Sequence, residues 1–159
     1  MRKKINIFLA VALMIVLSSC GFKPVAKSKF QDFNIVELNT NNNKKINFIL
    51  RQKMKRTLSN KEATNQIVLT INTSQIRNVN EKNVKNQITK YEISLTAKVD
   101  IIFLDKNKNK IFEVNDKGVY DIGSTHSDTM KNKKNVEELL AKRISEKIIN
   151  KIIFSKDDL

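Results

Sequence analysis

The most regular stretch of the sequence runs from Tyr91 to Phe103. Apolar side chains occupy every second position of it: Tyr91, Ile93, Leu95, Ala97, Val99, Ile101 and Phe103. The positions between them, Glu92 to Asp100, are polar or charged. Successive side chains of a strand point to opposite faces, so the pattern predicts a strand with one buried face, as in an antiparallel sheet. Ile102 and Leu104 are also apolar, and we expect the far end of this strand to be covered on both faces.

Two amphipathic helices are predicted where the apolar period changes. Residues 44–59 have apolar side chains at helical spacing and basic side chains on the remaining surface. The polar run Asn39–Asn43 precedes them, and we expect one of its side chains to cap the helix. A longer helix is expected at 135–154, with Glu137 near its positive end. Between the strands and this helix, residues 123–134 are interpreted as a polar loop.

Three more segments are expected to form strands. They are an apolar segment at 33–38, an alternating segment at 67–71 and a returning strand at 112–122. Asp116 and Gly118 interrupt the last one, which predicts a bulge or an irregular edge. The order is therefore β-α-β-β-β-α. It predicts an α+β fold, a mostly antiparallel four-stranded sheet with two helices packed on one face.

The beginning of the chain has the pattern of a lipoprotein export signal. Basic residues at 2–4 precede an apolar run from Ile7 to Leu17, which is shorter than the roughly 20 residues of a spanning helix. The run ends in Val16-Leu17-Ser18-Ser19-Cys20-Gly21, which contains the only cysteine. This segment resembles the lipobox of bacterial lipoproteins, and the resemblance implies cleavage before Cys20 and attachment of lipid to its thiol. An uncleaved anchor helix or a buried N-terminal helix is the alternative.

The predicted organisation follows from this pattern. It consists of a lipoprotein signal peptide at 1–19, a lipidated tether at 20–31, a single α+β domain at 32–155 and a C-terminal tail at 156–159. The signal peptide holds three of the 30 basic residues and none of the 16 acidic ones, so 140 residues with a formal charge of +11 remain. For an exported protein this charge favours an anionic lipid or glycolipid over nucleic acid. Compositional drift in a sequence rich in Lys, Asn and Ile is the alternative.

No catalytic or metal-binding constellation is recognised. His126 lies within Ser124–Asp128, which contains the atoms of a hydrolase triad, but neighbours in a loop rarely hold triad geometry. We interpret this segment as a solvated loop. Residues 105–110 imitate the oxygen spacing of a calcium loop, yet Lys110 stands where glycine is needed, so a hairpin turn is predicted. One histidine and one cysteine are too few for zinc. We expect a non-enzymatic protein without a cofactor or metal.

The run Cys20-Gly21-Phe22-Lys23-Pro24, together with the predicted order of elements, resembles the lipopolysaccharide-assembly lipoprotein family (LptE) of alphaproteobacterial type. The resemblance implies an LptE-like domain at 32–155, anchored by lipid at the periplasmic face of the outer membrane. It also implies two partners, which are lipopolysaccharide and an LptD-like outer-membrane β-barrel that the protein plugs and helps to assemble.

The family pattern carries no local motif for lipopolysaccharide contact. Basic residues cluster between the first two strands of the antiparallel part, in a polar loop or strand extension. This clustering predicts four lipopolysaccharide-binding residues: Arg77, Lys82, Lys85 and Lys90. Two other functions fit the sequence, a lipoprotein subunit of an ABC-type or intermembrane lipid transport system and a structural envelope lipoprotein without a ligand.

Overall fold

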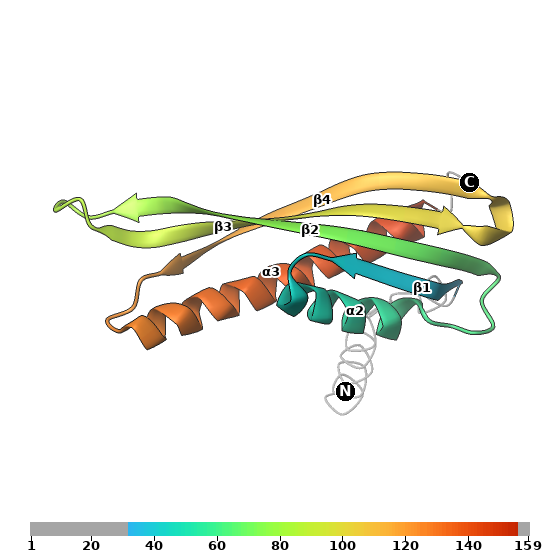
Figure 1. Cartoon of the computed structure of the whole chain (residues 1–159), viewed down its shortest axis with the longest axis horizontal. Coiled ribbons are helices and arrows are strands. Elements are labelled where there is room, and N and C mark those ends of the chain that lie inside the picture. Colours follow the sequence, from blue (N-terminus) through green and yellow to red (C-terminus); the bar gives the residue numbers. More distant parts are fainter. Residues whose placement is uncertain (1–31, 156–159) are drawn as a thin grey trace, which may run out of the picture.

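The computed structural model describes residues 32–155, which form one α+β unit (Figure 1). Its elements are β1 (Phe33–Asn41), α2 (Lys44–Leu58), β2 (Asn65–Lys82), β3 (Ile88–Phe103), the 3₁₀ turn η2 (Leu104–Lys106), β4 (Lys108–Asp121) and α3 (His126–Phe154). This order confirms the predicted fold class. The expected signal peptide, Cys20, the tether and the C-terminal tail lie outside the described residues.

The four strands form one sheet in the order β1-β2-β3-β4. β1 and β2 are parallel, whereas β2–β3 and β3–β4 are antiparallel hairpins. Parallel neighbours need a crossover connection, and α2 supplies it. Figure 1 shows α2 and α3 on the same face of the sheet, and no helix of residues 32–155 covers the other face, which we call the open face.

The core lies between the sheet and the two helices. The inward side chains of β3 from Ile93 to Phe103 are at most 2% exposed, as the alternation predicts. From α2, the core receives side chains at intervals of four residues, namely Ile46, Leu50, Met54 and Leu58. Burying one such side chain stabilises a fold by about 1.5–3 kcal/mol. This layer is therefore the main source of stability.

The expected cap of α2 is Asn43. Its side-chain oxygen accepts hydrogen bonds from the backbone N–H groups of Lys45 and Ile46, both at 3.2 Å. The first N–H groups of a helix have no partner within the helix, so this side chain satisfies two of them. The run of asparagines thus ends β1 and begins α2 within three residues.

The expectation of a polar loop at 123–134 is wrong, because α3 already begins at His126. Thr125 caps it: the hydroxyl accepts from the backbone N–H of Asp128 at 3.1 Å and donates to its carboxylate at 2.7 Å. A Thr-x-x-Asp capping motif was present in the sequence. Much of the surface of the first turns faces solvent, so their side chains are polar and show no apolar period. A helix forms there nevertheless.

The expected bulge in β4 is also absent. The β3–β4 register runs without a shift from Lys90↔Asp121 to Phe103↔Lys108. Gly118 interrupts the apolar parity for a different reason, since a Cβ atom there would lie 2.7 Å from Cγ1 of Val136 on α3. The glycine permits a close approach of helix and strand.

The open face of the sheet corrects a third expectation. Ile102 is 39% exposed and Leu104 46% exposed, so no part of the described chain covers that end on both faces. The predicted hairpin turn at 105–110 is confirmed, with Asn107 in the left-handed region at φ 48°. Of the alternatives for residues 77–90, the strand extension is correct, because β2 continues to Lys82.

Candidate functional site

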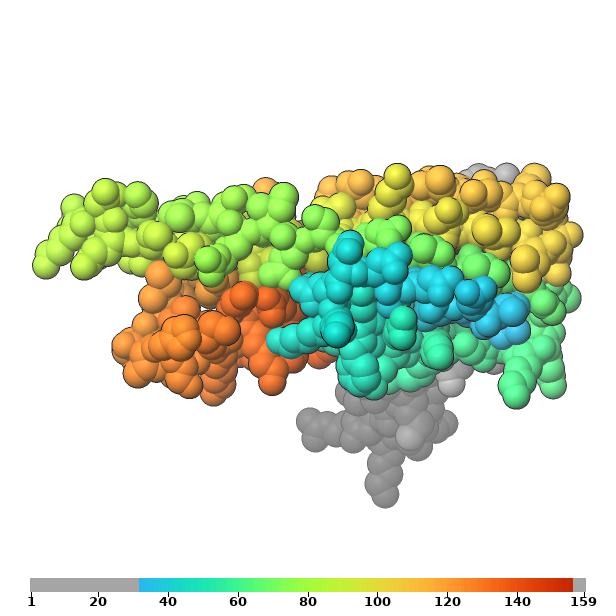
Figure 2. All heavy atoms as spheres, in the orientation of Figure 1, coloured from blue at the N-terminus to red at the C-terminus, as the bar shows by residue number. Residues whose placement is uncertain are grey.

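The four cations predicted to bind lipopolysaccharide all lie on the β2–β3 hairpin. Arg77 and Lys82 belong to β2, Lys85 lies in the connecting turn and Lys90 belongs to β3. We call residues 75–90 the distal hairpin. Figure 2 shows that it projects beyond the first turns of α3. The structure therefore gathers the four residues on one projection.

The four cations differ in their neighbours. Lys90 pairs with the carboxylate of Glu81 at 2.7 Å, and this pair lowers the pKa of Glu81 and raises the pKa of Lys90. Lys82 donates to the side-chain amide of Asn86 at 3.0 Å. The guanidinium of Arg77 lies 4.7 Å from the ring centroid of Tyr91, a cation–π contact. Within the described residues, Lys90 is thus the cation of this set whose charge is balanced by a carboxylate.

Tyr91 also connects the hairpin to the body of the protein. Its ring stacks on Tyr120 of β4 with centroids 5.7 Å apart, and Tyr120 is 3% exposed. Arg77, Tyr91 and Tyr120 therefore form a continuous stack from the hairpin into the core. This stack fixes the position of the guanidinium while its charge remains accessible.

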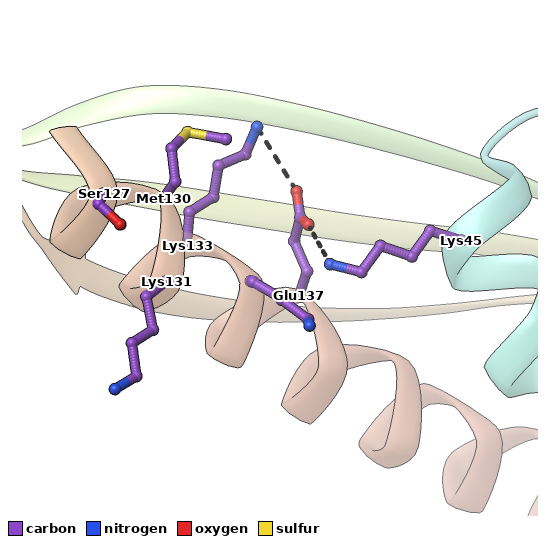
Figure 3. A pocket seen from close by; sticks show the side chains of 7 residues that line it. Lys45, Ser127, Met130, Lys131, Lys133 and Glu137 are labelled. Atoms are coloured by element: carbon purple, nitrogen blue, oxygen red, sulfur yellow. Dashed lines mark hydrogen bonds and ion pairs between the residues drawn. The ribbon is translucent and has the colours of Figure 1, made fainter.

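A second basic region, which sequence reasoning missed, lies between the N-terminal ends of α2 and α3. It is a shallow groove of about 450 Å³. Its lining combines four lysines with one glutamate and two uncharged side chains: Lys45, Lys131, Lys133, Lys134, Glu137, Ser127 and Met130. We call it the lysine groove, and Figure 3 shows it at close range.

Glu137 is the centre of the lysine groove. Its carboxylate lies 3.3 Å from Nζ of Lys45 and 3.6 Å from Nζ of Lys133, as Figure 3 shows. The side-chain amide of Gln75 on β2 donates to the same carboxylate at 3.0 Å and accepts from Asn43 at 3.1 Å. Three elements therefore meet at one carboxylate whose side chain is only 13% exposed, and two lysines share its charge.

The sequence could not reveal this groove directly. Lys45 and Glu137 are separated by 92 positions, and the polar sequence around Lys131 and Lys133 predicts a loop. The spacing of Ser127, Met130, Lys134 and Glu137 is helical, and it would have indicated a common face once the helix start at Thr125 was recognised.

The residues that imitate a hydrolase triad form a helix cap. His126 is the exposed first residue of α3. The hydroxyls of Thr125 and Ser124 donate to the carboxylate of Asp128 and hold its pKa below the ordinary range. The described part of the chain contains no group of three potential metal ligands. Among residues 32–155, no helix is both long and apolar enough to cross a membrane.

The described residues form an α+β domain of one four-stranded sheet and two helices, with basic side chains at its distal end. The family model of LptE, lipopolysaccharide assembly, matches residues 30–154, and the chain belongs to this family. No sequence among the curated proteins matches it significantly.

Solved structures of bacterial lipoproteins share the fold. Rare lipoprotein B of Shewanella oneidensis superposes with a TM-score of 0.63 at 13% identity, over 79% of this chain and 98% of the other. A lipoprotein of Caulobacter crescentus has a TM-score of 0.57 at 12% identity, with 83% and 95% covered. Lipoprotein B of Nitrosomonas europaea has a TM-score of 0.53 at 11% identity, with 84% and 88% covered.

Proposed function

We propose that this protein is an outer-membrane lipoprotein of the lipopolysaccharide transport machinery. It acts as the plug and assembly partner of an LptD-like β-barrel, binds lipopolysaccharide and aids its insertion into the outer leaflet, without enzymatic activity. The observation that carries this proposal is the family match across residues 30–154. The basic distal end and the organisation of the fold support it.

The direction of the domain suits a plug that is tethered at one end. β1 begins at Phe33, and in Figure 1 this start lies at the end of the molecule opposite the hairpin tip. A lipid on Cys20 would therefore hold one end near the inner leaflet while the distal hairpin points away into the barrel. The open sheet face has a polar centre, including Thr70, Asn72 and Lys98, and barrel lumens of this class are polar.

Lipid A phosphates are the expected ligands of the basic distal end. Arg77, Lys82 and Lys85 present charge without a carboxylate partner in the described structure, and charge-assisted hydrogen bonds to phosphate are strong. Lys90 contributes less because Glu81 is bound to it. The lysine groove adds further positive charge beside the hairpin.

Co-purification tests the assembly role. The tagged full-length chain, expressed in its own envelope and extracted with detergent, should bring down a large outer-membrane β-barrel in defined stoichiometry. The Cys20→Ser chain, which cannot be lipidated, should remain unprocessed and recover much less barrel. Recovery of ABC-transporter subunits instead would establish the alternative lipid transport role, and recovery of neither would refute both.

The ligand assignment has a separate test. Replacing Arg77, Lys82, Lys85 and Lys90 together by glutamine should weaken lipopolysaccharide binding at least about threefold, since each of the three cations without a carboxylate partner contributes roughly 0.2–1 kcal/mol. The matched control replaces four exposed lysines outside the distal hairpin, namely Lys55, Lys61, Lys98 and Lys106. If both quadruple variants lose the same affinity, only net charge matters and the assignment to the hairpin is wrong.

A further inference from the structure

The two edges of the sheet are treated differently. β4 forms one edge, and two lysines of α3 occupy the carbonyl oxygens at its middle. Lys147 Nζ donates to the carbonyl of Asn115 at 2.8 Å, and Lys151 Nζ donates to the carbonyl of Glu113 at 2.9 Å. Charged side chains over an edge discourage the addition of another strand. The middle of this edge is therefore blocked.

The distal half of β2 forms an edge of the other kind. β1 pairs with β2 only as far as Asn72. Asn65 donates its backbone N–H toward β1, and the carbonyl of Thr73 accepts from Asn42 on the same side. Backbone direction alternates along a strand, so Gln75, Arg77 and Val79 also turn their N–H and C=O groups to this side.

These backbone groups have no hydrogen-bond partner within the described part of the chain. The edge has defined ends: the caps at Asn42 and Asn43 lie at one end, and the register shift after Val79 lies at the other. We call Gln75–Val79 the free edge. It offers three donors and three acceptors at strand spacing.

We propose that the free edge accepts an extended, acidic segment of a partner protein, which adds to β2 as a strand beside the lysine groove. The occupant is a polypeptide because the free edge presents donors and acceptors in alternation. A phosphate or a carboxylate supplies acceptors only and would leave the carbonyls of Gln75, Arg77 and Val79 without partners. A peptide backbone satisfies both kinds of group, as in strand addition generally.

The acidic character follows from what lies under the free edge. Gln75 bonds to Glu137, whose carboxylate is already shared by Lys45 and Lys133. Arg77, on the same face of β2, has an aromatic ring as its neighbour. Every second side chain of an added strand would face these cations, and carboxylates at those positions would bind them. The inference goes beyond the proposed function, since it requires neither lipopolysaccharide nor a barrel.

The test uses the full-length chain and a short synthetic peptide of alternating valine and glutamate. Two derivatives carry backbone N-methyl groups, one on the glutamates and the other on the valines. In a paired strand, only alternate residues of the peptide donate their backbone N–H groups to β2. The derivative methylated at those residues should lose at least about tenfold in affinity, at roughly fivefold per lost hydrogen bond, while the other derivative should keep its affinity. Peptide binding should also slow amide exchange at Gln75, Arg77 and Val79. Equal affinity of the two derivatives, or unchanged exchange, overturns the proposal.

Protein variants test the charge component. Lys45→Gln and Lys133→Gln should each weaken peptide binding by up to about fivefold, whereas Lys98→Gln on the open sheet face should not. Lipid A is added as a competitor. If lipid A displaces the peptide and neither methylation pattern matters, the groove is an anion site and strand addition is refuted. A failure here leaves barrel co-purification untouched, so the two proposals fail separately.

Discussion

The two halves of β2 follow the same alternation and have opposite fates. In the first half, Ile67, Leu69 and Ile71 point inward and are fully buried. In the second half, Arg77 is exposed and Val79 is 48% exposed, although both continue the same parity. The strand geometry is equal in the two halves, so the difference must come from what lies over them.

The helical layer supplies that difference. α2 has 15 residues and α3 has 29, so the two helices cover unequal lengths of the sheet. The first turn of α2 reaches β2 at Thr73, whose hydroxyl donates to Asn47 at 3.1 Å. Beyond this point α2 no longer covers β2, and the inward positions of the strand change from isoleucine to glutamine and arginine. The proximal half builds the core, while the distal half presents charge and a free edge.

The largest expected effect contrasts a core residue with a distal one. Leu50→Ala should lower the free energy of unfolding by about 2–5 kcal/mol, because Leu50 is fully buried and its truncation leaves a cavity. Val79 occupies an inward position of β2, but its side chain is exposed. Val79→Ala should therefore change the free energy of unfolding by less than about 0.5 kcal/mol. Urea unfolding measures both. Similar losses would show that the distal hairpin is packed as tightly as the core.

Gly118→Ala tests how closely α3 packs on β4. The added Cβ would meet Cγ1 of Val136 at 2.7 Å, so we expect a loss of about 1–3 kcal/mol from overpacking. Val136→Ala in the same chain removes the clashing methyl groups and should restore part of the loss. The thermal midpoints of the two single variants and the double variant give the coupling. Strictly additive losses would contradict a direct contact.

Thr125→Ala should lower the free energy of unfolding by about 1 kcal/mol, because it removes one helix cap. Faster amide exchange should be confined to the first turns of α3. The pKa of Asp128 should rise toward its ordinary range, since the Thr125 hydroxyl is the main cause of its depression. A depressed carboxyl pKa stabilises the fold above the unfolded pKa, and this contribution is lost as the pH falls through the folded pKa. An unchanged Asp128 titration by NMR would contradict the cap.

The elements of the fold were largely predictable from the sequence. The alternation at 91–103, the period of α2 and the cap in the asparagine run each depend on neighbours a few positions apart, and all three are confirmed. The sequence pattern places the start of α3 too late because the first turns are polar. The capping motif at Thr125 does indicate the true start. The bulge expected at Gly118 was wrong because a helix approaches the strand there, and the strand sequence does not show the helix.

The candidate site was predictable only in part. The four cations of the distal hairpin are close in the sequence, and so they are also close in space on the extended strands: Arg77, Lys82, Lys85 and Lys90. The lysine groove depends on the meeting of Lys45, Gln75 and Glu137 from three elements. Glu81 neutralises Lys90 because the register of β2 and β3 shifts at this point, and the sequence does not predict that shift.

The sequence by itself determined the kind and order of the elements and the sign of the charge. These properties arise from local hydrogen bonding, from side-chain period and from composition. The tertiary structure decided which half of β2 is buried and which edge of the sheet Lys147 and Lys151 block. It also decided that Glu137 pairs with Lys45 and Lys133. Those outcomes depend on helix length and on distances between residues far apart in the chain, and no local pattern encodes such distances.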